Sequence, residues 1–209
     1  YVLNYNASAN GHTLVPKRRL MELASALLGV DAEKCSDAID VLEYKKKVTV
    51  AEVGGRKCVY LTRYYEAEHY IKDKLDMLEA VCEKIETDDT DALINETEKQ
   101  MGIVFDRMQR KAILRTLLGG VLVLTGGPGT GKTTVIKGIV ELFRRLGKSF
   151  ILAAPTGRAA KRMTETTGEE AKTIHRMLEM VYTDEREPKF MRDGNNPLDE
   201  QLIIIDEAS

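Results

Sequence analysis

The segment GGPGTGKT at residues 126–133 has the composition of a phosphate-binding loop. It matches G-x-x-x-x-G-K-[ST], whose glycines let backbone N–H groups surround phosphates because no Cβ is in the way. A helix that opens after the loop adds a favourable dipole for an anion. Lys132 is expected to reach the β- and γ-phosphates, and Thr133 to place its hydroxyl on Mg²⁺. We therefore predict a nucleoside triphosphate site whose contacts are Gly127, Pro128, Gly129, Thr130, Gly131, Lys132, Thr133 and Thr134.

Two adjacent acids, Asp206 and Glu207, follow the apolar run LIII at 202–205. In phosphate-loop proteins a carboxylate at the end of a neighbouring buried strand holds Mg²⁺, usually through water. Asp206 fits that position, and Glu207 is placed to polarise the attacking water. Because one carboxylate is assigned to the metal and the other is left as a base, the pair favours nucleotide hydrolysis over simple binding.

Weaker signals come from three other places. Gln109 has a carboxamide with donors and an acceptor, which suits an adenine edge, although a helical Gln taken alone is usually a surface residue. In APTGRAAKRM (154–163), Thr156 at a helix start and Arg158 can contact a phosphate backbone. A solvated helix face explains those charges equally well. His175 is a lone helical histidine, and by itself it indicates neither catalysis nor metal ligation.

These motifs must be positioned by helices and strands, and hydrophobic periodicity predicts where such elements lie in the sequence. From residue 103 onward the pattern alternates between amphipathic helices and continuously apolar strands, which is typical of strands with both faces covered. Helices are predicted at 103–118, 132–146, 157–166 and 170–181, strands at 121–125, 149–154 and 202–206, and a long loop at 182–200. This alternation predicts right-handed crossovers and a parallel sheet in an α/β fold.

The first half of the chain has a different pattern. Residues 1–13 are polar and predicted to be irregular, helices are predicted at 16–28 and 31–43, and a β-hairpin at 47–53 and 56–62 around two glycines. This order is typical of the second half of a winged-helix domain, and a generic small α+β module explains it equally well. A long helix at 66–86 and an acidic linker with a short helix at 87–100 follow.

We predict three segments from these patterns. They are a winged-helix-like domain at 1–65, a connecting helix and linker at 66–102, and the N-terminal part of a nucleotide-binding α/β domain at 103–209.

Composition sets further bounds. The 209 residues are 43% hydrophobic and carry a net charge of −2, so any nucleic-acid site must be a local patch. No apolar run approaches about 18 residues, and we expect neither a membrane span nor a secretion signal. Three widely spaced cysteines favour reduced thiols and a cytoplasmic location. Because the chain starts at Tyr1 rather than Met, we expect further residues before it.

In their order and spacing, the segments FDRMQRKAI, LTGGPGTGKTT, APTGRAAKRM, TIHRML and LIIIDEAS resemble the first motor domain of superfamily 1 DNA helicases. The resemblance is closest to the RecD-like helicases, including the stand-alone bacterial type. The strong motifs cover about residues 103–209. Over residues 1–86 the resemblance is weaker, but that family carries a winged-helix-like region just before its motor.

The resemblance implies a RecA-like fold, ATP and Mg²⁺ as ligands, and 5′-to-3′ translocation on single-stranded DNA or at a single-strand/duplex junction, in DNA repair or recombination. It assigns adenine recognition to Gln109, catalysis to Lys132, Asp206 and Glu207, and metal binding to Thr133 and Asp206. Thr156, Arg158 and His175 are expected near the DNA. The second RecA-like domain and its arginine finger are not in this sequence, so we expect the 209 residues alone to be nearly inactive as a motor.

Two alternatives stay open. An AAA+ ATPase shares the Asp-Glu pair, although Gln109 and the 154–163 segment argue against it. A GTPase is disfavoured because it requires D-x-x-G after the third strand, where this chain has DEAS. The other alternative is a non-enzymatic module in which residues 1–86 bind DNA or a protein partner.

Overall fold

The computed structural model describes residues 1–82, 84–87, 89–127, 129–183 and 187–207. The chain forms two compact units, Tyr1–Ala80 and Val81–Ser209, and each is described by itself. In the described part of the chain, no helix is both long and apolar enough to cross a membrane. The segment limits predicted above, 1–65, 66–102 and 103–209, stay predictions.

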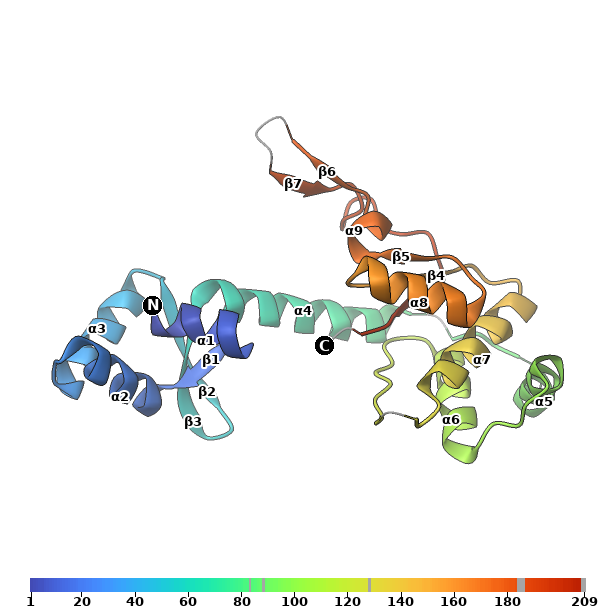
Figure 1. The fold of residues 1–209 in the computed structure, drawn as a ribbon, viewed down its shortest axis with the longest axis horizontal. Helices are drawn as coiled ribbons and strands as arrows, with labels where there is room; N and C mark the ends of the chain where they lie inside the picture. The colour runs from blue at the N-terminus through green and yellow to red at the C-terminus, as the bar shows by residue number, and fades with distance from the viewer. Residues whose placement is uncertain (83, 88, 128, 184–186, 208–209) are drawn as a thin grey trace. The chain divides into compact units, whose positions relative to one another are not determined.

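The first unit combines helices with a small antiparallel sheet (Figure 1). Its elements are α1 (Val2–Asn10), β1 (Leu14–Pro16), α2 (Lys17–Leu28), α3 (Ala32–Tyr44), β2 (Val48–Val53), β3 (Arg56–Leu61) and α4 (Thr62–Val81). The strand order is β1-β3-β2, and both pairings are antiparallel. The central strand β3 is covered by a core made of Leu3, Val15, Leu20, Ile39, Val48 and Val59.

Sequence periodicity found α2, α3 and the hairpin within one or two residues of their ends. The hairpin turn has φ values of 57° at Gly54 and 74° at Gly55, a conformation that glycine adopts without steric penalty. The expectation of irregular structure at 1–13 was wrong, because α1 occupies most of that segment. Only Leu3 of α1 is buried, so the helix has almost no apolar stripe for a pattern search to detect.

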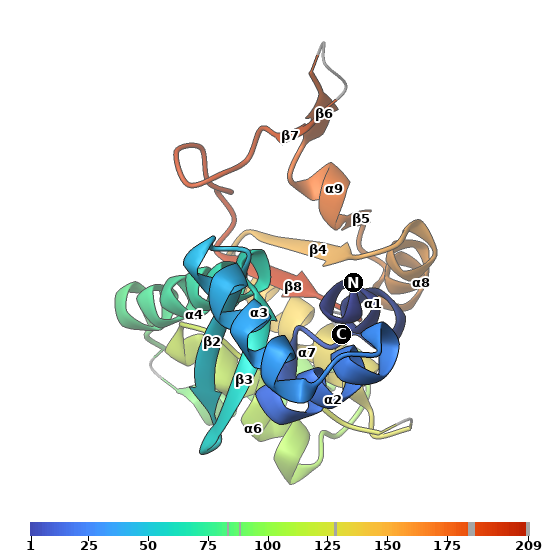
Figure 2. The ribbon, with the colours of Figure 1, turned by 90° about the vertical axis from the view of Figure 1, so that its left-hand side faces the viewer.

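The second unit has a parallel sheet, as the α/β pattern predicted. Its strand order is β5-β4-β8, with β5 at Ala171–Thr173, β4 at Phe150–Ala154 and β8 at Leu202–Ile205. Both neighbours of β4 run parallel to it, and Figure 2 shows β4 and β8 side by side. The other elements are α5 (Thr90–Met101), α6 (Arg107–Arg115), the 3₁₀ turn η1 (Thr116–Leu118), α7 (Lys132–Arg145), α8 (Gly157–Thr167), α9 (Ile174–Met177), β6 (Met180–Tyr182) and β7 (Pro188–Phe190).

The largest core of this unit joins α7 to α5 and α6. It consists of Ile94, Phe105, Ile113, Leu117, Val135, Ile139, Leu142 and Phe143. Leu202 and Ile204 of β8 pack against this core. A second cluster places Ile136 and Val140 of α7 against Leu152 of β4. Helix α7 therefore packs on the sheet on one side and on α5 and α6 on the other.

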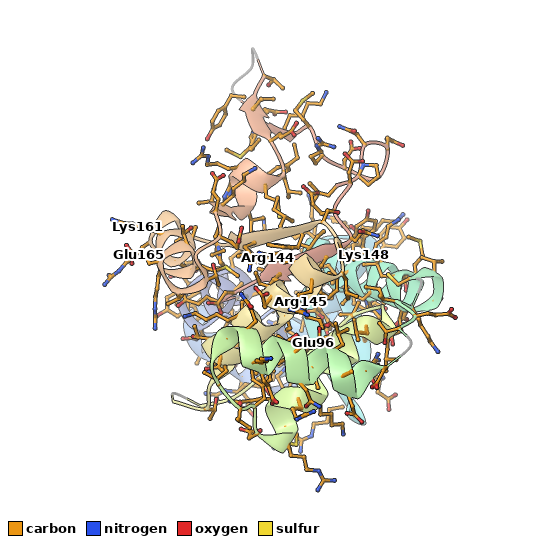
Figure 3. The ribbon with its side chains drawn as sticks, turned by 90° about the vertical axis from the view of Figure 1, so that its right-hand side faces the viewer. Glu96, Arg144, Arg145, Lys148, Lys161 and Glu165 are labelled. Atoms are coloured by element: carbon orange, nitrogen blue, oxygen red, sulfur yellow. The ribbon has the colours of Figure 1, made fainter. Side chains whose placement is uncertain are left out.

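Ion pairs at the surface add to this packing. Arg145 in the last turn of α7 forms an ion pair with Glu96 of α5. Both side chains are labelled in Figure 3. Arg144 is bonded to Glu141 and Glu169. The hydrogen bond to Glu169 is the main cause that raises the pKa of the Arg144 guanidinium.

The structure corrects three sequence predictions in this unit. Residues 121–125, predicted as a strand, join no sheet among the described residues. Only Leu124 of this run packs against the main core, while Val123 is 78% exposed. The helix predicted at 170–181 is instead β5, α9 and β6, and the predicted loop at 182–200 contains β7, which pairs with β6. The hydrophobic pattern shows which residues are apolar. Whether such a segment forms a strand depends on pairing with another segment that is distant in sequence.

Candidate nucleotide-binding site

The phosphate-binding loop leads directly into α7, as predicted. Gly129 and Gly131 have φ values of 76° and 80°, in the left-handed region that glycine tolerates best. Gly131 is also the residue that precedes the first turn of α7. The loop therefore reaches its helix through backbone conformations that a side chain would strain. Pro128, one of the predicted contacts, lies outside the described residues.

Lys132 is folded over the loop that precedes it. Its Nζ atom donates to the carbonyl oxygens of Gly126, at 2.5 Å, and Gly127, at 2.8 Å. The hydroxyl of Thr130 donates to the Gly127 carbonyl at 2.9 Å. The ammonium group thus lies among backbone groups of the loop, where it provides positive charge for an anion. Thr133 is exposed and Thr134 is half-buried in the first turn of α7.

Gln109 lies against this loop. A Cβ built on Gly131 would be only 2.3 Å from the Gln109 side-chain nitrogen, so the glycine allows the close approach. The Gln109 carboxamide oxygen accepts the Asp106 N–H at 3.0 Å, and Asp106 in turn caps α6 by accepting from the Gln109 N–H at 2.9 Å. This reciprocal capping box fixes the side chain at the start of α6. The fold therefore joins two motifs that are separated in sequence.

Glu98 is a supporting residue that the sequence analysis missed. It is 9% exposed, and its carboxylate accepts the Phe105 N–H at 2.8 Å. Arg110 of α6 forms an ion pair with the same carboxylate at 3.3 Å and donates to Asn95 at 2.8 Å. A buried carboxylate with this set of donors ties α5 to the start of α6, where Gln109 lies. A mid-helix Glu has no motif around it, so only the tertiary structure identifies this role.

The acidic pair follows β8 as predicted. The Asp206 N–H donates to Ala153 of β4 at 3.0 Å, which continues the strand pairing by one residue. The Asp206 carboxylate accepts the Glu207 N–H at 3.0 Å. Glu207 has φ 55°, an uncommon value for a residue other than glycine. Its carboxylate is 3.9 Å from Arg162 in the middle of α8, so this helix passes close to the end of β8.

Topology directs the first turn of α7 to the same edge. The connection from α7 to β4 is short, so the helix and the strand run in opposite directions, and the helix N-terminus faces the carboxyl end of the sheet. Ligands of open α/β sheets bind at that edge. The loop, Gln109 and the acidic pair therefore belong to one region of the second unit.

The DNA-contact candidates are exposed but less organised. Thr156 is the N-cap of α8, where its hydroxyl accepts the Ala159 N–H at 3.2 Å, and Arg158 is exposed in the first turn. His175 of α9 is exposed, with its ring centroid 6.2 Å from that of Phe190. Thr156 and His175 both follow the ends of parallel strands, β4 and β5, and so lie toward the same sheet edge. Their roles in DNA binding stay predictions.

The residues present fit a triphosphate and a metal. A Cβ at Gly126 would lie 2.6 Å from the Thr130 hydroxyl, so the loop closes tightly only around glycine. The loop supplies an ammonium group and a helix N-terminus for anionic oxygens, and Thr133 and Asp206 supply the oxygen ligands that Mg²⁺ prefers.

Comparisons with known proteins agree with this geometry. Residues 109–209 match the model of the AAA domain family. The ATP-dependent RecD2 DNA helicase of Deinococcus radiodurans is 41% identical over 103 residues, which are 48% of this chain and 14% of that protein. The RecBCD enzyme subunit RecD of Buchnera aphidicola (subsp. Schizaphis graminum) is 33% identical over 174 residues, 72% of this chain and 27% of that protein.

A phage protein shows the same similarity over a shorter stretch. The ATP-dependent DNA helicase dda of Enterobacteria phage T4 is 45% identical over 60 residues, 28% of this chain and 14% of that protein. The matched stretches thus cover 14% to 27% of the length of these three relatives. Taken with the loop, the parallel sheet and the acidic pair at its edge, these similarities support the resemblance to the RecD-like superfamily 1 helicases.

Proposed function

We propose that the second unit is the nucleotide-binding part of an ATP-driven DNA helicase motor with a RecA-like fold. Residues 126–134 hold the phosphates, and Lys132 contacts the β- and γ-phosphates. Thr133 and Asp206 hold Mg²⁺, and Gln109 recognises the adenine edge. The observation that carries this proposal is the contact of Gln109 with Gly131, because it joins a base-recognising side chain to the loop that precedes Lys132.

Each side chain has a defined part in hydrolysis. Thr133 and Asp206 would hold Mg²⁺, which would supply charge neutralisation at the phosphates when bound. Lys132 exchanges its bonds to the loop carbonyls for bonds to phosphate oxygens, and its charge stabilises the transferring group. Glu207 orients and deprotonates the attacking water, while Asp206 stays with the metal. Arg162, at 3.9 Å, is placed to hold the Glu207 carboxylate turned toward α8 before nucleotide binds.

We further propose that DNA, as a single strand or a single-strand/duplex junction, is the polymer on which the motor acts, and that Thr156, Arg158 and His175 contribute contacts. The names of the relatives support this assignment. The first unit is proposed to be winged-helix-like, which its element order and its three-stranded sheet β1-β3-β2 support. Translocation requires a second motor domain, so it is proposed only for a longer protein that contains this chain.

The AAA+ alternative makes a different prediction about base recognition. In the helicase proposal Gln109 lies at the loop and selects adenine, so a GTP analogue should compete poorly with an ATP analogue. Equal competition by GTP would favour a different class of phosphate-loop protein.

Binding of a fluorescent ATP analogue with Mg²⁺ to the 209-residue chain tests the site. Lys132→Ala removes a charge-assisted contact worth about 1.5–3 kcal/mol, so the dissociation constant should rise about 10- to 100-fold. Lys137→Ala is the matched control, because Lys137 is an exposed lysine of the same helix outside the loop. Unchanged affinity in the Lys132 variant, or an equal loss in the control, would refute the assignment.

A further inference from the structure

The first unit contains a cationic hollow of about 650 Å³ that no part of the proposed motor site uses. We call it the cationic hollow, and its lining residues are Pro16, Lys17, Arg18, Arg19, Glu22, Arg56 and Lys57. Three of the five cations are consecutive in the first turn of α2, and the other two open β3. Two segments far apart in sequence therefore bring positive charge to one place.

Strand pairing explains why these segments meet. β1 pairs with β3 so that Pro16 is opposite Cys58. Helix α2 starts at the next residue, Lys17, while β3 continues backward through Lys57 and Arg56. The register of the sheet thus fixes the start of α2 beside the beginning of β3, and with it the position of the charges.

Neighbouring acids neutralise the hollow only in part. Glu22 is shared by Arg18, at 3.4 Å, and Arg19, at 3.2 Å, while Lys17 is bonded to Asp40 at 3.0 Å. Glu52 is opposite Lys57 across the hairpin. Five cations outnumber these three carboxylates.

Helix stability does not account for the charges. The first turn of α2 has no acidic residue, and cations near a helix N-terminus are unfavourable by about 0.3–1 kcal/mol each. Exposed pairs such as those with Glu22 contribute little stability. Arg18 is 94% exposed in its side chain, so its guanidinium is accessible to a ligand. A partner with repeated negative charge accounts for the cluster better than the fold does.

An adjoining apolar hollow indicates which anionic partner fits. It shares Pro16 and Arg19 with the cationic hollow and includes Tyr5 of α1. Tyr5 is 56% exposed, and its ring is stacked with that of Tyr1 at a centroid distance of 6.3 Å. Cations beside exposed aromatic rings are the combination that holds the phosphates and stacks the bases of a single strand.

The charges elsewhere in the first unit also favour the cationic hollow as the place where a polyanion would bind. Helix α3 carries four carboxylates, Glu33, Asp37, Asp40 and Glu43, against one lysine, so its surface disfavours a polyanion. The start of α2 and the beginning of β3 have the opposite balance. Nucleic-acid contact in this unit is therefore expected at the hollow and not along α3.

We propose that the cationic hollow, together with Tyr5, is an accessory binding surface for single-stranded DNA. The choice of DNA rests on the proposed helicase function, while the phosphate-and-base chemistry rests on the side chains alone. The surface holds a strand independently of nucleotide, because none of its residues belongs to the phosphate-binding loop or to the acidic pair.

Fluorescence anisotropy of a labelled oligothymidylate, titrated with the 209-residue chain over a range of salt concentrations, measures this binding. Every protein carries Arg158→Ala, which weakens the DNA contact expected in the second unit. The test variant is Arg56→Gln with Lys57→Gln. The matched control is Lys45→Gln with Lys47→Gln, which removes the same charge at the other end of the hairpin, about 17 Å away along the strands.

The test variant should bind about tenfold more weakly, and the slope of log affinity against log salt should become shallower by about 1 for each residue replaced. Tyr5→Ala should weaken binding at least about fivefold and leave that slope unchanged, because stacking releases no counterions. The control should match the parent. Circular dichroism verifies folding, and Arg18→Gln, at a fully exposed side chain, replaces the test variant if that one unfolds.

Several results would overturn the proposal. They are unchanged affinity in the test variant, an equal loss in the control, a duplex bound more tightly than the single strand, or polyglutamate bound as tightly as DNA. Lys132→Ala, measured in parallel, separates this proposal from the nucleotide site. It should lose binding of the ATP analogue and keep binding of the oligothymidylate, so either proposal can fail while the other stands.

Discussion

At the scale of single residues, the site depends on contacts between motifs. Lys132 is held by its own loop, and Gln109 approaches that loop because Gly131 has no side chain. Glu98 supports this arrangement from outside the loop, because it ties α5 to α6 through the Phe105 N–H and Arg110. The proposed recognition of nucleotide by Gln109 therefore relies on a buried carboxylate that no motif includes.

Glu207→Gln is the sharpest test at this scale. In a protein that contains this chain together with a second motor domain, this variant should bind the ATP analogue as the parent does, because Lys132, Thr133 and Asp206 are unchanged. Its hydrolysis rate should fall by about 10²–10⁴, the usual contribution of a general base. Glu165→Gln of α8, an exposed position 3.9 Å from Lys161 (Figure 3), serves as the control. Single-turnover hydrolysis measures the rate, and a parent-like rate would exclude Glu207 as the base.

At the scale of elements, the approach of α7 to α6 depends on Gly138. A Cβ at this position would be 2.5 Å from Cδ1 of Ile113 and 2.8 Å from Cζ of Phe105, and both neighbours are buried. The two helices must lie this close for Gln109 to contact Gly131. A glycine in a helix interior is unfavourable by about 1 kcal/mol relative to alanine, so packing is the reason for it here.

Gly138→Ala should therefore destabilise the second unit despite its better helix propensity. Overpacking costs about 1–3 kcal/mol, which offsets or exceeds the gain of about 1 kcal/mol from propensity. Gly157→Ala in the first turn of α8 is the control, since nothing lies within 4 Å of its added Cβ. Urea unfolding measures both variants. A Gly138 variant more stable than the parent would show that the helices separate without penalty.

Comparison of elements shows what the sequence can determine. Helix α7 and strands β4 and β8 were predicted closely, because the apolar periodicity and flanking glycines of the helix and the continuous apolar runs of the strands are local signals. β5 was mistaken for part of a helix, because its three residues become a strand only through pairing with β4. Likewise the run at 121–125 is apolar enough for a strand but joins no described sheet.

The residues of the candidate site also divide into those that local sequence signals predict and those that only the folded structure identifies. The loop, Asp206 and Glu207 were assigned to the site from residue type and spacing, because the chemistry itself imposes that pattern, and their roles stay predictions. The roles of Glu98 and Gly138 were not found, because they arise from side chains that meet only after folding. The cationic hollow was visible only as scattered charges until the β1–β3 register placed them together.

At the scale of the whole molecule, the two proposed binding functions belong to different units. Every proposed nucleotide-site residue lies in Val81–Ser209, whereas the cationic hollow lies in Tyr1–Ala80. The main core around Ile113 and Phe143 is built entirely from the second unit. The core around Val59 is built entirely from the first. Each unit therefore has its own hydrophobic core, which supports the binding surface proposed for that unit.

We predict that residues 81–209 produced alone fold and bind the ATP analogue with Mg²⁺ within about threefold of the 209-residue chain, a difference below about 1 kcal/mol. A chain of this length buries enough apolar surface to fold independently. The same protein should lose the oligothymidylate binding that depends on Arg56 and Lys57. Circular dichroism and analogue titration of the two proteins test this, with Lys132→Ala in both as the baseline for non-specific binding. A shortened protein that is unfolded, or that binds the analogue more than about tenfold more weakly, would show that residues 1–80 help to build the nucleotide site.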